Sequence, residues 1–277
     1  MAELVGVWRE PEFSPGRVED DAAILERTRD ALAARGIGLQ LARHDVLADA
    51  RPTAVLAMCQ SAAALAALDR AARGARIINH PDAIRGCYRH ETVRRLAGTP
   101  VPFPATRIVS TVEPGRDVAD AAPCWVKRGD VHAMTTADVV FAAKGDDVAA
   151  ALADFARRGV ARAALQAHVA GIVVKFYGVA DGRFFRCFTD AGAIPAPIAA
   201  LWSAASAGAR TLGLEIFGGD LVVTAEGQPV LVDLNDWPSF ARCRDEAAEA
   251  IAGYVLDQLD TSRSAGDTRD HGSEARS

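Results

Sequence analysis

The run Val230-Leu231-Val232-Asp233-Leu234-Asn235 near the C-terminus constrains the fold more than any other part of the chain. In an extended strand the side chains alternate between two faces, so Asp233 and Asn235 point to one side while the intervening apolar side chains point into a core. The residues that follow, Asp236-Trp237-Pro238, also fit a turn, because Asn and Asp side chains hydrogen-bond to their own backbone. The pattern predicts a β-strand with one polar face, and its function depends on what lies beside it.

A further acidic residue, Asp220, can reach the same face. It lies between the apolar runs 214–217 and 221–224, and Gly218-Gly219-Asp220 predicts a short hairpin. The turn signal at 227–229 then brings the chain back, so three oxygen ligands can meet on one face of an antiparallel sheet. Mg²⁺ usually binds through a few carboxylate or amide oxygens together with nucleotide phosphates. The sequence therefore predicts an Mg²⁺–ATP site with the metal ligands Asp220, Asp233 and Asn235.

The composition is that of a globular protein with a sizeable core. The chain has 277 residues, of which 50% are hydrophobic and 24% are charged, and its net charge is −5. This acidic balance gives no support to nucleic-acid or membrane-surface binding. The five cysteines are scattered and form no metal-type pair, which predicts reduced thiols. Without a signal-peptide pattern or an apolar stretch that could span a bilayer, we expect a cytoplasmic protein, either monomeric or oligomeric.

Alternating strand and helix signals predict a parallel α/β domain over residues 1–85. The turn at 8–11 (Trp-Arg-Glu-Pro) lacks the glycine fingerprint of a dinucleotide fold, so we expect no NAD or FAD there. The predicted strands are 4–8, 37–41, 54–59 and 76–79, with a helix at 19–35 and an alanine-rich helix after residue 59.

The rest of the chain predicts α+β architecture in two parts, 86–165 and 166–260, followed by a polar, disordered tail at 261–277. Three prolines at 100–104 mark a boundary segment that cannot be helical. The predicted strands are 124–127, 138–142, 163–169, 173–179 and 184–188, and the predicted helices are 88–97, 146–158, 195–212 and 244–259.

The order of these features resembles the ATP-grasp superfamily between Ile78 and Leu259. The resemblance implies an ATP-grasp fold, in which two α+β subdomains close on ATP and an N-terminal parallel α/β domain adds substrate contacts. The features that carry it are Arg85–Leu96 before Pro100-Val101-Pro102, Trp125-Val126-Lys127, Leu165–Val169, Lys175, Arg186, Gly218-Gly219-Asp220 and Asp233-Leu234-Asn235.

The same resemblance implies the nucleotide contacts. Lys127 matches the family's phosphate-binding lysine at the end of a strand, and Arg89 stands where the family has its first lysine. The hinge between the subdomains would recognise adenine through Gln166, Ala167, His168 and Val169, although this chain has Gln-Ala where the family often has Gln-Glu. The loop at 128–134, directly after Lys127, has a single glycine, whereas many ATP-grasp ligases have a glycine-rich loop there. Arg128 and His132 are therefore candidates to replace the loop amides around the phosphates.

Two basic residues, Lys175 and Arg186, are the predicted catalytic groups. They lie on the two strands of a hairpin that the family places under the transferred phosphate, where positive charge stabilises the equatorial oxygens. Arg186 interrupts an apolar run, and a charge in such a place usually has a partner. The remaining substrate candidates are Arg9, Glu10, Arg17, Arg242 and Arg244.

Three functions stay open. The first is a carboxylate–amine ligase that resembles glutathione synthetase and the ribosomal-protein glutamate ligases. It would use small-molecule or peptide substrates, an acyl phosphate, and two Mg²⁺ ions (or Mn²⁺) bridged by Asp233. The second is a kinase that resembles the ATP-grasp inositol polyphosphate kinases. The third is nucleotide binding without turnover. We favour the ligase.

Overall fold

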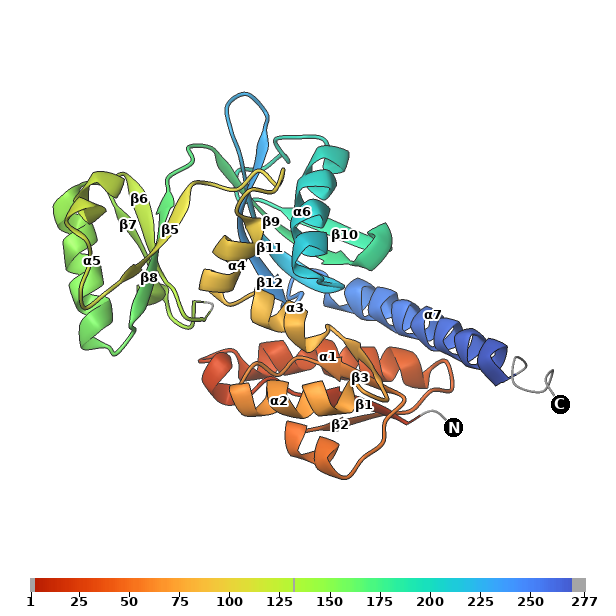
Figure 1. Ribbon diagram of the computed structural model, residues 1–277. Helices are drawn as coiled ribbons and strands as arrows, with labels where there is room; N and C mark the ends of the chain where they lie inside the picture. Colours follow the sequence, from red (N-terminus) through yellow and green to blue (C-terminus); the bar gives the residue numbers. More distant parts are fainter. Residues whose placement is uncertain (1–2, 132, 271–277) are drawn as a thin grey trace.

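Three four-stranded sheets with their helices make up the chain (Figure 1). The computed structural model describes residues 3–131 and 133–270, so His132 lies outside the described residues. One sheet is parallel and the other two are antiparallel. This confirms the predicted combination of an N-terminal α/β domain with α+β architecture.

The parallel sheet and its helices form the N-terminal lobe. Its elements are β1 (Leu4–Val7), α1 (Val18–Ala33), β2 (Leu39–Ala42), β3 (Ala54–Ala57), α2 (Ala62–Ala71), β4 (Arg76–Ile78) and α3 (Pro81–Gly86). The strand order is β2-β1-β3-β4. Every side chain of β1 and β3 is buried, as expected for parallel strands covered on both faces.

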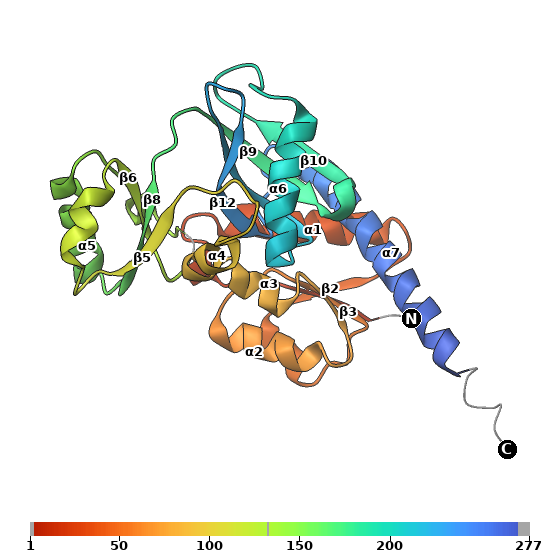
Figure 2. The same ribbon diagram turned by 45° about the horizontal axis from the view of Figure 1, so that its top comes forward.

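The first antiparallel sheet forms a small lobe that stands to one side of the molecule (Figure 2). Its elements are β5 (Thr106–Ser110), β6 (Cys124–Arg128), β7 (Val139–Ala142), α5 (Gly145–Arg157) and β8 (Arg162–Ala167), in the strand order β5-β8-β6-β7. Val148, Leu152 and Phe155 of α5 are buried in a core that belongs to this lobe alone. The sequence does not predict β5, because an edge strand that is partly exposed on both faces has no apolar periodicity.

The second antiparallel sheet forms the C-terminal lobe. Its elements are α4 (Arg89–Leu96), β9 (Ile172–Val179), β10 (Phe184–Phe188), α6 (Ile198–Leu212), β11 (Ile216–Val223), β12 (Pro229–Asp236) and α7 (Arg244–Asp270), in the strand order β10-β9-β11-β12. Trp237 and Phe240 after β12 share one core with side chains of the N-terminal lobe. The two lobes are therefore packed together, whereas the small lobe is joined to them by the two segments 97–105 and 168–171. Short 3₁₀ turns occur at Pro11–Phe13, His44–Ala48, Arg116–Ala121, Thr136–Asp138 and Ala180–Gly182.

The hairpin predicted at Gly218-Gly219-Asp220 is wrong, because β11 runs through these residues without a turn. The glycines are needed because neighbouring chain segments approach β11 closely at these two positions. A Cβ atom at Gly218 would lie 2.8 Å from Pro238 Cγ and 2.9 Å from the carbonyl oxygen of Phe176, and one at Gly219 would collide with the carbonyl oxygen of Asp233. Glycine in a strand interior marks either a bend or a close neighbour, and here it is the neighbour.

Two predicted boundaries also differ from the structure. Strand β8 ends at Ala167, two residues before the predicted strand end at 169. Helix α7 continues to Asp270, beyond the predicted end at Leu259 and into the segment predicted to be disordered. Extending an existing helix costs little compared with starting one, and residues 261–270 contain no proline to stop it. Residues 271–277 lie outside the described residues. Across the described part of the chain, no helix is long and apolar enough to cross a membrane.

Candidate active site

Two carboxylates meet across neighbouring strands of the C-terminal sheet. Asp220 of β11 is directly opposite Asp233 of β12, and Lys175 of β9 is opposite Asp220. Directly opposed side chains in an antiparallel pair lie on the same face, so these three residues form one row across the sheet, which we call the metal row. Lys175 Nζ lies 3.1 Å from Asp220 Oδ1. The structure brings together both acidic residues that the sequence proposes as metal ligands.

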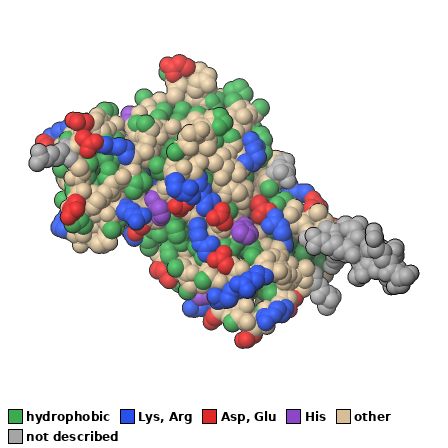
Figure 3. Space-filling model, viewed as in Figure 1, with side chains coloured by type: hydrophobic (Ala, Val, Ile, Leu, Met, Phe, Trp, Pro, Cys, Tyr) green, Lys and Arg blue, Asp and Glu red, His purple; other side chains and the backbone are tan. Residues whose placement is uncertain are grey.

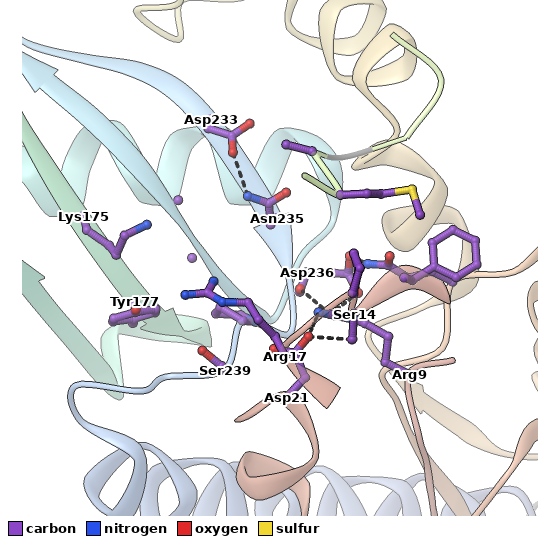
Figure 4. A pocket seen from close by; sticks show the side chains of 18 residues that line it. Arg9, Ser14, Arg17, Asp21, Lys175, Tyr177, Asp233, Asn235, Asp236 and Ser239 are labelled. Atoms are coloured by element: carbon purple, nitrogen blue, oxygen red, sulfur yellow. Dashed lines mark hydrogen bonds and ion pairs between the residues drawn. The ribbon is translucent and has the colours of Figure 1, made fainter. Parts of the chain in front are cut away.

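Asn235 extends this set along β12. Its Nδ2 donates to Asp233 Oδ2 at 2.9 Å (Figure 4), so its carbonyl oxygen is not used by this bond. Two carboxylates and an amide oxygen suit Mg²⁺ and differ from the thiolate and imidazole sets of zinc sites. Within residues 3–131 and 133–270, no three His, Cys, Asp or Glu side chains gather to hold a metal. The donor set therefore fits a cation that takes its remaining ligands from phosphate and water.

Two buried cations face these carboxylates. Arg89, at the start of α4, donates from Nη1 to Asp233 Oδ1 at 3.1 Å and from Nε to the carbonyl oxygen of Arg128 at 3.0 Å. Lys127, on β6 of the small lobe, donates from Nζ to the carbonyl oxygen of Val232 at 3.0 Å. Burying a cation is costly unless an anion lies near. The two positive charges thus lie where the small lobe meets β12.

Burial and charge shift the pKa values of this cluster in different directions. Burial alone would raise the pKa of Asp233, but Arg89 and Lys127 outweigh it and hold the pKa at about 2. Burial lowers the pKa of Lys127 to about 8, and Arg89 acts in the same direction against the attraction of Asp233 and Asp220. Burial and the charge of Asp233 raise the pKa of Asp220, although Lys175 opposes them. At neutral pH Asp233 is fully ionised and Lys127 is mostly protonated.

Gln166 belongs to the same cleft. It is buried on β8 and donates from Nε2 to the carbonyl oxygen of Val232 at 3.3 Å. The cavity between Gln166, Lys127 and Arg89 has a volume of only about 10 Å³, which is room for about one water molecule. A purine could enter here only after the small lobe moves away from β12.

The other proposed adenine contacts do not point into this cavity. Ala167 lines a depression elsewhere, together with Arg107 and Leu165. The ring of His168 packs against Phe141, with 5.1 Å between ring centroids. The amide hydrogens of Ala167 and His168 are already donated to the carbonyl oxygens of other residues, and Val169 is half-buried. Of these four residues, the structure brings only Gln166 beside the buried cations Lys127 and Arg89.

Arg186 is not brought to the metal residues. It lies on the edge strand β10, where its guanidinium donates to Glu246 at 2.6 Å and covers the ring of Phe184. Tyr177 stands in the row between Arg186 and β11. The partner expected for a charge in this apolar run is therefore an acidic residue of α7. This position does not support the catalytic role predicted for Arg186.

The secondary candidates also form surface ion pairs. Arg128 pairs with Asp130, Arg242 with Asp190 and Arg244 with Asp20. By contrast, Arg9 lies between lobes, where it donates to the carbonyl oxygens of Asp236 and Trp237 at 3.1 and 2.8 Å. Glu10 accepts hydrogen bonds from the amides of Gln60 and Ser61 at the start of α2.

A pocket of about 210 Å³ adjoins the metal row on the side of the N-terminal lobe (Figure 4). Its walls include Asp233 and Asn235 of β12, Lys175 and Tyr177 of β9, and a group of N-terminal residues. Charges of both signs gather along this junction of the lobes (Figure 3). The sequence gives Arg9 and Arg17 as substrate candidates, but it gives no signal for Gln60 and treats Asp236 as a turn residue. The residues that line the pocket from the N-terminal lobe and from the end of β12 are Arg9, Ser14, Arg17, Asp21, Gln60 and Asp236.

The contact between Gly219 and β12 provides a test of how tightly the metal row is built. Replacing Gly219 with Ala should push β11 away from the carbonyl oxygen of Asp233. We expect a loss of about 1–3 kcal/mol in unfolding free energy, as for other overpacked sites, together with weaker Mg²⁺-dependent nucleotide binding. Gly38→Ala is the matched control, because a Cβ atom there meets no neighbour within 4 Å. Equal denaturation midpoints for the two variants would contradict the tight packing of the strands.

Solved structures with a similar fold share little sequence with the chain. A RimK-domain ATP-grasp protein from Sphaerobacter thermophilus has a TM-score of 0.67 at 21% identity, covering 92% of this chain and 100% of that one. D-cycloserine synthetase DcsG has a TM-score of 0.66 at 19% identity, covering 92% and 99%. The D-alanine–D-alanine ligase from Bacillus anthracis has a TM-score of 0.70 at 10% identity, covering 96% and 100%.

No protein-family model and no curated protein matches the sequence. The three structural similarities cover nearly the whole chain, from the parallel N-terminal sheet to the sheet that carries Asp220 and Asp233. They concern the course of the backbone, because the identities are low. The chain has the ATP-grasp fold.

Proposed function

We propose that the protein is an ATP- and Mg²⁺-dependent ligase that joins a carboxylate to an amine through an acyl phosphate. The observation that carries the proposal is the meeting of the Asp220–Asp233–Asn235 set with Lys127 and Arg89 between two lobes. Such a site offers oxygen ligands to a divalent cation and positive charge to a triphosphate. Proteins named as ligases or synthetases share the fold, which supports this class.

Each residue has a role in this proposal. Lys127 and Arg89 would hold phosphate oxygens, and the side chain of Gln166 would lie toward the base. Bound Mg²⁺ would neutralise the phosphates and align the transferred group. Lys175 lies in the row of the ligands and would stabilise the charge on the transferred phosphoryl group. Arg186 has no part in this arrangement.

The pocket beside the metal row favours the ligase over the kinase. An inositol phosphate carries several negative charges and needs a wall of cations. Here the pocket combines Arg9, Arg17 and Lys175 with the carboxylates of Asp21, Asp233 and Asp236, and two of these cations are already paired with carboxylates. A pocket of mixed charge suits a small carboxylate or amine better than a polyphosphate.

Trapping with hydroxylamine tests the proposed reaction. We expect the protein to form hydroxamates when incubated with ATP, Mg²⁺, hydroxylamine and a pool of carboxylic acids, because hydroxylamine captures acyl phosphates. The variant Asp233→Ala/Asn235→Ala serves as the inactive control. Phosphorylated polyols without hydroxamate would favour the kinase, and the absence of ADP release with every pool would leave only nucleotide binding without turnover.

A further inference from the structure

Two residues of the pocket each have a buried hydrogen-bond acceptor that lacks a donor. Asp236 is 1% exposed and Gln60 is 4% exposed, yet Asp236 Oδ2 and Gln60 Oε1 accept no hydrogen bond from the residues that the structure describes. Leaving such a group unsatisfied costs about 1–3 kcal/mol, and native proteins contain few of them. Both residues line the pocket beside the metal row (Figure 4 labels Asp236). We call this pair the acidic wall.

The neighbouring donors cannot satisfy the acidic wall, because they are already used. Gln60 Nε2 donates to Asp236 Oδ1 at 2.8 Å, and reversing the amide would place its oxygen against the carboxylate. Arg9 Nη2 lies 3.8 Å from Asp236 Oδ2, which is an ion-pair distance and too long for a hydrogen bond. The guanidinium of Arg9 instead donates to Asp21 and to the carbonyl oxygens of Met58, Asp236 and Trp237.

The charge around the acidic wall is also unbalanced. Arg9 is a single cation that forms ion pairs with two carboxylates, Asp21 at 3.2 Å and Asp236 at 3.8 Å. Asp21 has a further donor, because Ser14 Oγ donates to its Oδ2 at 2.6 Å. The excess negative charge therefore lies on the side of Asp236. A ligand that supplies both positive charge and hydrogen-bond donors would correct both deficits.

The opposite side of the pocket has the opposite character. Arg17, at the start of α1, reaches toward the side where Lys175 and Tyr177 lie (Figure 4). Its guanidinium makes no hydrogen bond or ion pair with another side chain in the described part of the chain, whereas Lys175 is paired with Asp220. The pocket volume of about 210 Å³ is below the roughly 300–1,000 Å³ of most small-molecule sites. A ligand that fits this pocket would therefore be small and would carry both charges.

We propose that the acidic wall binds the primary ammonium group of a small zwitterionic substrate whose carboxylate faces Arg17. An ammonium group has three donors, enough for Asp236 Oδ2 and Gln60 Oε1. The fate of this substrate rests on the proposed ligase function, since the ligase consumes an amine or a carboxylate in this pocket. The binding selectivity itself can be measured without turnover.

Equilibrium binding of simple probes tests the proposal in the absence of ATP. The probes are L- and D-alanine, with lactate and N-acetylalanine as matched compounds that lack the ammonium group. We expect at least one alanine enantiomer to bind at least about tenfold more tightly than both matched compounds, as expected for a charged hydrogen-bonded pair. Asp236→Asn should remove this preference, whereas Arg17→Met should weaken alanine and lactate alike.

Asp190→Asn is the control outside the pocket. It removes a carboxylate whose side chain is 97% exposed and leaves Arg9, Gln60 and Asp236 unchanged, so alanine binding should change by less than about threefold. Folding of each variant is checked by circular dichroism, and Gln60→Met replaces Asp236→Asn as the test variant should the latter not fold. Equal binding of alanine and lactate, no binding of either enantiomer at tens of millimolar, or an unchanged preference in the test variant would overturn the proposal.

The outcome separates the two proposals. Alanine-selective binding that depends on the acidic wall, without ADP release from any substrate pool, would support the proposed ammonium-binding site and contradict the proposed ligase function. Hydroxamate formation by a protein that binds alanine and lactate equally would support the ligase function and contradict the proposed ammonium-binding site.

Discussion

Changing Asp233 and Asn235 together to alanine is expected to abolish Mg²⁺-dependent nucleotide binding. The double change removes one of two carboxylates and the amide oxygen from the metal set. Loss of a single supporting group at a metal site costs about 10- to 100-fold in affinity, so the loss of two ligands should cost at least about 100-fold. Nucleotide affinity in wild-type protein and in the variant is measured by calorimetry, with Mg²⁺ and with EDTA.

The comparison with EDTA separates the contribution of Mg²⁺ to nucleotide affinity from any effect of the double change on folding. Nucleotide binding without metal should be at least as strong in the variant as in the wild-type protein, because Lys127 and Arg89 remain and no longer pair with Asp233. The variant leaves these two buried cations without their anion, which costs about 3–5 kcal/mol of stability, so its folding must be verified.

Asn235→Ala alone keeps the anion and should still lose about tenfold in Mg²⁺-dependent affinity. Asp190→Ala, on a side chain that is 97% exposed, controls for loss of charge. A folded double variant that keeps the Mg²⁺ effect would falsify the site.

The sequence predicts the metal row because that row depends on local rules. Alternation along a strand places Asp233 and Asn235 on one face, and a single turn at 227–229 fixes which strand lies beside them. Lys127 and Arg89 come instead from the resemblance to the ATP-grasp superfamily, which matches them to its phosphate-binding residues. The hairpin wrongly predicted at 218–220 shows the limit. Two consecutive glycines are equally compatible with a turn and with a strand that has close neighbours. Only the contacts with Pro238 and Phe176 distinguish these two cases.

The pocket could not be predicted in the same way, because its residues meet only through packing of the lobes. Gln60 and Asp236 are 176 positions apart and form a hydrogen bond, and no periodicity links them. Arg186 shows the reverse case. Its apolar surroundings indicate a partner, but the partner is Glu246 on a helix, whereas the resemblance to a family suggests a phosphate. Local patterns indicate that a charge is paired and leave open what pairs with it.

Lys127 should make nucleotide affinity fall as the pH rises through about 8. Burial lowers the pKa of Lys127 to about 8, reinforced by Arg89 and opposed by Asp233 and Asp220. Above this pH the free protein loses the charge that attracts phosphate. Lys127→Arg keeps its charge and should show a flat profile between pH 7 and 9, whereas Lys127→Met should bind nucleotide about 10- to 100-fold more weakly at pH 7. Calorimetric titrations at a series of pH values measure all three proteins.

The same lysine should change stability in the opposite direction. Its pKa is lower in the folded protein than the ordinary value of 10.5, so between pH 8 and 10.5 the unfolded chain binds more protons. The contribution of Lys127 to the unfolding free energy therefore rises with pH in this window, by about 3 kcal/mol at most. Lys127→Met should remove that rise, and its unfolding free energy at pH 7 should equal or exceed that of the wild-type protein, because an apolar side chain replaces a buried cation. Urea denaturation at pH 7 and pH 9.5 measures both effects. A variant that loses stability and nucleotide affinity together at pH 7 would show that Lys127 supports the fold and is not held in place for a phosphate.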